Sequence, residues 1–322
     1  MSVRPGVTGL KYENPAINPY LGIILAVIAV SFSSIFTKLA AAPPLAIAFY
    51  RLSFTVLLLA PLSLNAASRA EFTRISRKDI FLAVISGAFL ALHFTVWISS
   101  LNYTSVASST VLVTLQPLFV VTGGFFFFKE KISRKGLAGI ALTLSGSVLI
   151  GINDFKIGGE ALFGDLLAFS GAFFVAVYFL IGRSLRGRLS LFPYVFLVYG
   201  TTSIFLLLFN VATATPLYPY PWQDWLWFFL LALVPTILGH TVFNWALRYI
   251  QAAVVSVSIL GEPVGATILA YFIFQEIPGL LQIAGGLTII LGLYIFITCS
   301  FIQEQKINNY QLNRQKASRK EG

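Results

Sequence analysis

Runs of about 20 apolar residues recur along the whole chain, and short polar or proline- and glycine-rich segments separate them. Because a helix of about 20 residues crosses the ~30 Å hydrocarbon core of a bilayer, each run predicts one membrane-spanning helix. Ten runs are expected, at 20–41, 44–63, 80–101, 105–128, 136–152, 163–183, 191–211, 225–247, 251–274 and 279–299. The pattern predicts an all-α integral membrane protein with ten transmembrane helices.

The second half of the chain repeats the first. A shift of 146 residues aligns 92–146 with 238–292 without a gap, and 14 of the 55 positions are identical. The identities include Pro117 with Pro263 as well as glutamates and glycines, which a shared apolar composition does not explain. Since each half holds five expected helices, an odd number, the halves enter the membrane from opposite sides. Inverted repeats of this kind are typical of secondary transporters.

Charge changes the picture in two ways. Charged residues make up 11% of the chain and hydrophobic residues 57%, whereas soluble domains carry about 25% charged residues, so a water-soluble fold is excluded. With a cytoplasmic N-terminus, the cytoplasmic loops and tails hold 19 of the 22 lysines and arginines. This distribution predicts that both termini are cytoplasmic. It also accounts for the net charge of +10 without a nucleic-acid partner.

These boundaries predict a domain organisation. The expected parts are a cytoplasmic tail 1–19, a first five-helix repeat 20–152, an extracytoplasmic linker 153–162, a second five-helix repeat 163–299 and a basic cytoplasmic tail 300–322. The segment "KLAAAPP" loosely resembles a signal-peptidase site. Because further spans follow it, the first helix is expected to be retained.

Three motifs resemble a known family. They are "PPLAIAFYR", the pattern "Y-x(13)-P-x(12)-E" in each half, and "GDLLAFSGAFFVAVYFLIGR". On these motifs the chain resembles the drug/metabolite transporter superfamily, in its ten-helix form with two EamA-type domains, over nearly all of 18–299. The resemblance implies a carrier of amino acids, sugars, nucleotide sugars or drugs, frequently an exporter, in the cytoplasmic (inner) membrane. No motif diagnostic of a substrate is present.

Prolines inside three expected helices predict interruptions. Pro117 and Pro263 occupy matching positions near the middle of their spans, and Pro235 lies within a third span. Each proline lacks a backbone N–H and leaves the carbonyl four residues earlier without its helical donor. Paired discontinuities in two halves predict the position of a transport site.

Three polar side chains are expected at one depth near these prolines. By helix rise, Glu262 lies roughly 18 Å from the inner face of the bilayer core, while Arg51 and His93 lie roughly 10 Å from the outer face. One interpretation is a structural Arg51–Glu262 ion pair. Another is that Glu262 or His93 binds substrate or a proton. A third is a buried, protonated Glu262 with no partner.

Polar and aromatic residues on the inward stripes complete the expected site. His240 lies about 100° around its helix from the position equivalent to His93, so the two histidines are not both expected to be central. The expected substrate-binding residues are His93, Trp97, Arg51, Glu262, Gln116, Tyr178, Asn244 and His240.

The sequence favours a transporter over an enzyme. The motifs H-E-x-x-H and G-x-S-x-G are absent, and we expect no catalytic residue, metal or cofactor. We expect a secondary transporter that moves a small metabolite, such as an amino acid, by alternating access, with export favoured. Its expected partners are the substrate and the lipid bilayer, with a proton as coupling ion left open, and its expected state is a monomer or weak dimer. The alternatives are a membrane scaffold or sensor, and a carrier of sugars, nucleotide sugars or drugs.

Overall fold

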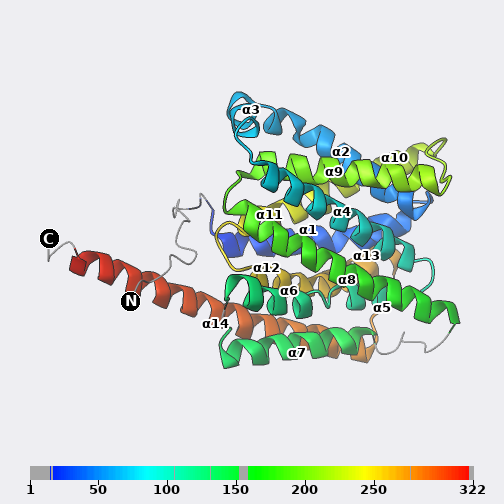
Figure 1. The fold of residues 1–322 in the computed structure, drawn as a ribbon. Helices are drawn as coiled ribbons and strands as arrows, with labels where there is room; N and C mark the ends of the chain where they lie inside the picture. The colour runs from blue at the N-terminus through cyan, green and yellow to red at the C-terminus, as the bar shows by residue number, and fades with distance from the viewer. Residues whose placement is uncertain are drawn as a thin grey trace.

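The computed structural model describes residues 15, 17–104, 106–130, 132–151, 159–275 and 277–318. These residues form helices and connecting segments, and the described ranges contain no strand. Most of the helices run lengthwise through one bundle (Figure 1). The all-α fold expected from the hydrophobic pattern is therefore confirmed.

The helical segments differ widely in length, from the 3 residues of η3 to the 39 residues of α14. In chain order they are α1 Pro19–Leu39, α2 Pro44–Ser63, α3 Ala66–Phe72, α4 Arg77–Ser100, α5 Val106–Val113, α6 Pro117–Gly123, η1 Gly124–Phe128, α7 Arg134–Gly151, α8 Gly159–Arg186, α9 Leu191–Ala212, α10 Trp222–Leu231, η2 Ala232–His240, α11 Thr241–Ala246, α12 Ala252–Ser258, η3 Ile259–Gly261, α13 Glu262–Phe274 and α14 Leu280–Ser318.

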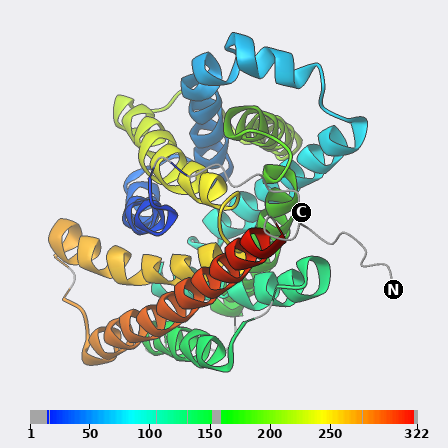
Figure 2. The ribbon, with the colours of Figure 1, turned by 90° about the vertical axis from the view of Figure 1, so that its left-hand side faces the viewer.

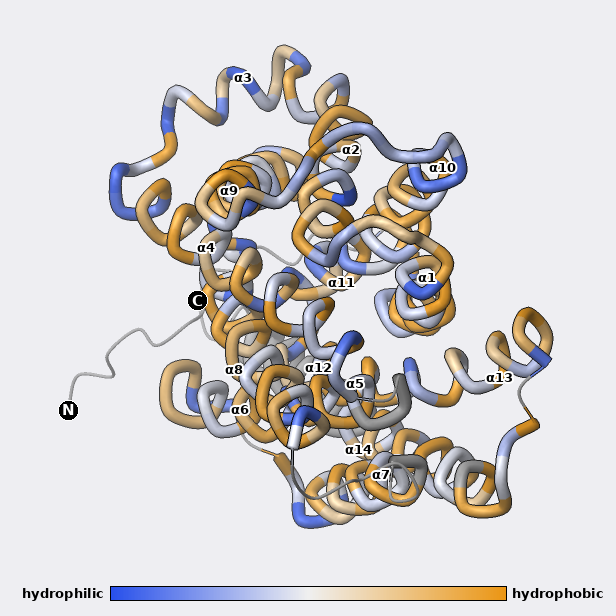
Figure 3. The backbone as a smooth tube through the Cα atoms, turned by 90° about the vertical axis from the view of Figure 1, so that its right-hand side faces the viewer, coloured by the Kyte–Doolittle hydropathy of each residue, from blue (hydrophilic) through white to orange (hydrophobic). Residues whose placement is uncertain are grey.

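Nine helical stretches within the described ranges are long and apolar enough to cross a membrane. Hydrophobic residues predominate along these helices (Figure 3), and many large apolar side chains are exposed, such as Phe127 at 77%. Exposure of such an apolar surface to water is unfavourable, whereas the acyl chains of a bilayer solvate it. The chain is therefore an integral, multi-pass membrane protein. The expected span 136–152 forms α7, which begins with Arg134 and Lys135 and is not among the nine.

Three of the nine spans are interrupted where the prolines occur. Residues 114–116 separate α5 from α6, which begins at Pro117. A 3₁₀ turn, η3, separates α12 from α13, and Pro263 lies in the first turn of α13. Around Pro235 the helix widens into the π-helical segment η2. At η3 the backbone N–H of Glu262 donates to the carbonyl of Ile259, which Pro263 leaves without its helical donor.

Helices α7 and α14 pack lengthwise against each other along one side of the bundle (Figures 1 and 3). Glycines permit this contact: a Cβ atom at Gly146 would lie 2.7 Å from the carbonyl oxygen of Gly285. A Cβ atom at Gly139 would lie 2.8 Å from the backbone nitrogen of Phe296. The repeated glycines are therefore used for packing within one chain.

The first helix begins and the last helix ends at the same end of the bundle (Figure 1). Helix α14 continues to Ser318. It extends beyond the other helices and passes obliquely across them when the bundle is viewed from that end (Figure 2). Residues 300–318, which belong to the expected C-terminal tail 300–322, continue the helix, because residues 293–318 contain neither proline nor glycine to end it.

Candidate functional site

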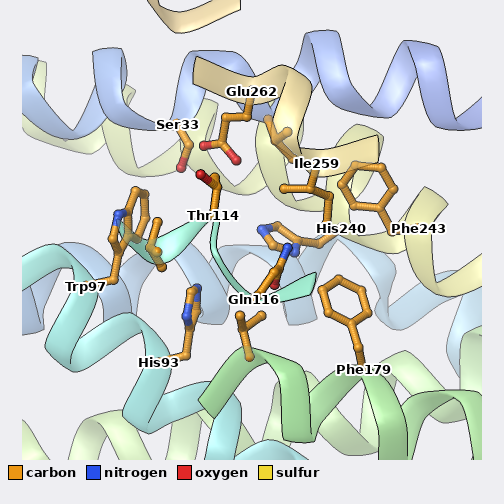
Figure 4. Close-up of a pocket in the computed structure, with 13 residues that line it drawn as sticks. Ser33, His93, Trp97, Thr114, Gln116, Phe179, His240, Phe243, Ile259 and Glu262 are labelled. Atoms are coloured by element: carbon orange, nitrogen blue, oxygen red, sulfur yellow. The ribbon is translucent and has the colours of Figure 1, made fainter. Parts of the chain in front are cut away.

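A small cavity lies in the bundle interior beside the interrupted helices (Figure 4). Its lining residues are Val30, Ser33, His93, Trp97, Val113, Thr114, Gln116, Val175, Phe179, His240, Phe243, Ile259 and Glu262. The cavity volume is about 30 Å³. Since a water molecule needs roughly 10–15 Å³ measured in this way, the cavity has room for about two waters.

Equivalent residues of the two halves line the same cavity. The pairs related by the 146-residue shift are Trp97 with Phe243, Val113 with Ile259 and Gln116 with Glu262. Gln116 directly precedes α6 and Glu262 begins α13, so both helix interruptions face this cavity. The cavity wall therefore contains three pairs of residues that the sequence repeat relates.

Glu262 supplies the one carboxylate of the lining. Glu262 is 9% exposed, and Figure 4 shows its carboxylate directed toward Thr114 and Ser33. Its backbone carbonyl accepts a hydrogen bond from the Ser31 hydroxyl at 3.4 Å. An ion pair with Arg51 was one interpretation of the sequence, but no such pair forms among the described residues. Equal depth in the membrane did not bring the two side chains into direct contact.

Arg51 is fully buried and stands behind the cavity wall. Its Nε donates to Thr236 Oγ1 at 2.8 Å, and its Nη1 donates to Ser33 Oγ at 2.9 Å. The guanidinium also lies over the ring of Phe94, 4.5 Å from the centroid. Because Ser33 lines the cavity, Arg51 is one hydrogen bond away from its interior.

His93 and Trp97 lie one helical turn apart on α4 and form one wall of the cavity. Their rings are nearly parallel, at 8°, with centroids 6.0 Å apart. His93 Nδ1 lies 2.9 Å from the carbonyl oxygen of Gly171. A carbonyl only accepts, so Nδ1 carries a proton, and a neutral imidazole then leaves Nε2 as an acceptor. Gly171 thus orients the imidazole ring.

His240 also lines the cavity, so the expectation that the two histidines are not both central was wrong. His240 ends the π-helical segment η2 (Ala232–His240) and lies three residues before Phe243, which also lines the cavity. Residues three apart on a helix share one face, so an offset of about 100° from the position equivalent to His93 does not remove His240 from the cavity wall.

Several polar atoms of the site are buried without a hydrogen-bond partner among the described residues. They include Trp97 Nε1, Gln116 Oε1 and His240 Nδ1 in the lining, and Arg51 Nη2 behind it. Buried polar groups are nearly always hydrogen-bonded, so these atoms are available to bind water or a ligand in the cavity. In the described part of the chain, no group of three or more His, Cys, Asp or Glu side chains is placed to hold a metal.

Tyr178 and Asn244, both expected in the site, do not line the cavity. They belong to a separate buried network, in which Asn244 Nδ2 contacts the Tyr178 hydroxyl and donates to the Tyr199 hydroxyl at 3.1 Å. The Tyr199 hydroxyl in turn lies 3.3 Å from Thr241 Oγ1. These contacts join α8, α9 and α11 beside the cavity.

Eight lining residues were not among those expected: Val30, Ser33, Val113, Thr114, Val175, Phe179, Phe243 and Ile259. The repeat contains the signal for Phe243, because the 146-residue shift pairs it with Trp97. Thr114 lies two residues before Gln116, in the interruption itself. Ser33 stands among other serines of α1, and nothing in the sequence distinguishes it from them.

Comparison with known proteins agrees with this architecture. The model of the EamA-like transporter family matches residues 18–152 and again 162–298. The chain therefore belongs to the EamA-like transporter family, and the resemblance drawn from its motifs is confirmed. Proteins of this family are membrane transporters.

Individual relatives are distant but extensive. An Archaeoglobus fulgidus protein described as an uncharacterized transporter is 25% identical over 273 residues, covering 85% of this chain and 94% of that protein. The pseudopaline exporter CntI of Pseudomonas aeruginosa is 24% identical over 284 residues, covering 84% of this chain and 94% of the exporter. A solved crystal structure shares the fold with a TM-score of 0.72 at 18% identity, covering 88% of this chain and 98% of that one.

Proposed function

We propose that this protein is a secondary transporter of a small metabolite bearing an amino group, such as an amino acid, in the cytoplasmic membrane. The observation that carries this proposal is the cavity in which Glu262 faces unpaired polar atoms of Trp97, Gln116 and His240. The substrate forms hydrogen bonds with these groups, which have no partner among the described residues.

The chemistry of the lining favours this substrate class. The carboxylate of Glu262 suits an ammonium group, and the indole N–H of Trp97 suits an acceptor such as a substrate carboxylate. Phe179, Phe243 and the valines offer apolar contacts to a side chain. The lining contains no lysine or arginine, which disfavours nucleotide sugars because their phosphates need cationic partners.

The size of the cavity supports alternating access. Ligand sites usually measure about 300–1,000 Å³, whereas this cavity measures about 30 Å³. A substrate therefore needs the cavity walls to separate. The walls come from equivalent segments of both halves, and two such halves separate by rocking about the site.

A ten-span topology completes the proposal. Helix α7, which packs against α14, is proposed as the tenth span. Both termini then lie in the cytoplasm. The two halves then have opposite orientations, with boundaries near 20–152 and 163–299. Export is the proposed direction, supported by the name of the Pseudomonas aeruginosa exporter.

Glu262 is also the proposed carrier of a coupling proton. It is the buried carboxylate of the cavity, and membrane-interior carboxylates of transporters commonly take part in proton relays. Substrate ammonium and proton would then compete for the same group.

A transport assay tests the function directly. Purified protein is first screened for thermal stabilisation by amino acids, sugars and nucleotides, and any stabilising compound is then tested for flux in proteoliposomes with and without a pH gradient. We expect an amino acid to stabilise the protein and to cross the membrane. A charge-assisted hydrogen bond contributes about 1.5–3 kcal/mol, so the deaminated analogue should bind about 10- to 150-fold more weakly.

The controls separate the alternatives. Empty liposomes measure leakage, and the amino-acid enantiomer measures stereospecific recognition. A compound that stabilises the protein but does not cross the membrane supports the sensor alternative. Stabilisation by nucleotide sugars, with none by compounds that bear an amino group, would contradict the proposed substrate class.

A further inference from the structure

A second and larger hollow lies on the bundle side, formed by α4, α6, η1 and α8. Its volume is about 790 Å³. The residues lining this lateral groove are Leu82, Phe119, Thr122, Gly123, Phe127, Phe128, Phe173, Ala176, Val177, Leu180, Ile181 and Ser184. None of them lines the central cavity, and ten of the twelve are apolar or glycine. The groove is therefore a separate, mainly apolar feature.

The length of the groove matches one leaflet of a bilayer. Along α8 its lining runs from Phe173 to Ser184, twelve residues whose eleven steps span about 16 Å of helix rise. Half of the ~30 Å hydrocarbon core is about 15 Å. The groove reaches the bundle end at which η1 and α8 both finish and α4 begins. It thus extends from the membrane surface to near the bilayer centre.

Basic side chains stand where the groove meets that surface. Lys129 directly follows the lining residue Phe128, and Lys78 lies one helical turn before the lining residue Leu82. Both lysines are exposed. Arg188 Nη2 donates to Ser184 Oγ at 3.4 Å, and Asp79 partly offsets its charge through a 2.8 Å ion pair. The groove mouth therefore carries an excess of positive charge.

We propose that this groove binds an anionic phospholipid of the adjacent leaflet, with one acyl chain along α8 and the phosphate beside Lys78 and Lys129. The apolar lining and its one-leaflet length select an acyl chain. The basic mouth selects an anionic headgroup, as basic pockets between membrane helices commonly do. The site is independent of the central cavity and of the transported substrate.

Native mass spectrometry of the purified full-length protein tests the proposal, with dioleoylphosphatidylglycerol and dioleoylphosphatidylcholine as probes of equal chain length. We expect wild-type protein to retain phosphatidylglycerol in preference to phosphatidylcholine. A basic residue near an anionic headgroup contributes about a fivefold gain in binding, so the double variant Lys78→Gln/Lys129→Gln should lose about 30-fold in phosphatidylglycerol binding. Its phosphatidylcholine binding should not change.

Two further variants keep the result interpretable. The matched control Arg69→Gln/Arg74→Gln removes two exposed charges on and beside α3, away from the groove, and should retain the preference. Thr122→Trp fills the groove with an indole and should weaken retention of both lipids while leaving the lysines intact. Equal retention of the two lipids by wild-type protein would overturn the proposal. So would an unchanged preference in the Lys78→Gln/Lys129→Gln variant.

Discussion

The contact between α7 and α14 makes a quantitative prediction about two glycines. Gly146→Ala adds a methyl group 2.7 Å from the carbonyl oxygen of Gly285 and 2.8 Å from the backbone nitrogen of Ile289. Both neighbours are backbone atoms, so neither can rotate away, and the helices must separate. Gly200, inside α9, has no heavy atom within 4 Å of an added Cβ, and Gly200→Ala is the matched control.

The same substitution should therefore stabilise the protein at position 200 but not at position 146. Alanine is favoured over glycine in a helix by about 1 kcal/mol, which stabilises both variants. Overpacking costs about 1–3 kcal/mol, and this cost applies only at Gly146. We expect Gly146→Ala to be less stable than Gly200→Ala by about 1–3 kcal/mol. At about 2–4 °C per kcal/mol, thermal unfolding in detergent resolves that difference.

The comparison also separates packing within the chain from packing between chains. If the glycines mediate a dimer, Gly146→Ala should shift the molecular mass measured by light scattering while the monomer keeps its stability. Equal unfolding midpoints for Gly146→Ala and Gly200→Ala would refute the close approach of α7 and α14. A double variant with Gly139→Ala should lower the midpoint further.

Two more predictions concern the ends and the interior of the bundle. Burial raises the pKa of the Glu130 carboxyl. The guanidinium of Arg183, whose Nε lies 3.7 Å from Glu130 Oε1, and the backbone N–H groups of Ala252 and Ala253 offset this rise only in part. Because the folded state holds this proton more tightly than the unfolded state, stability should be fullest at low pH and decline as pH rises through the raised pKa. Glu130→Gln should flatten that decline above the ordinary glutamate pKa of 4.5, and an unchanged slope would be contrary evidence. Arg51→Lys keeps the charge but cannot reproduce the two hydrogen bonds and the stacking of the guanidinium, so proteoliposome flux should fall about 10-fold or more, whereas Arg69→Lys should leave it unchanged.

The hydrophobic pattern predicted the all-helical fold and its long apolar helices, although not the short helix α3. Apolar runs of membrane length leave little alternative to a helical fold, because the bilayer satisfies no backbone hydrogen bond. The effect of proline is equally local, so Pro117, Pro235 and Pro263 marked the interruptions. Arithmetic on helix rise placed Glu262 and His93 near one depth, and both line the cavity.

Rotation about the helix axes was not predictable in the same way. Helix rise gives depth only, so it could not show that Arg51 bonds Thr236 and Ser33 instead of Glu262. The calculated offset of His240 did not show that it lines the cavity together with Phe243, three residues later on the same helix face. Tyr178 and Asn244 have the polarity of site residues, but tertiary packing places them in a neighbouring network.

A paired comparison of flux through Glu262→Gln and Glu160→Gln is the most direct measurement of the role assigned to the cavity. Both substitutions remove one carboxylate charge with little change in size, and Glu160 is exposed in the first turn of α8. If Glu262 holds the substrate, proteoliposomes containing Glu262→Gln should lose at least about 10-fold in flux while Glu160→Gln retains the wild-type rate. Wild-type flux through the folded Glu262→Gln protein would show that the substrate crosses elsewhere.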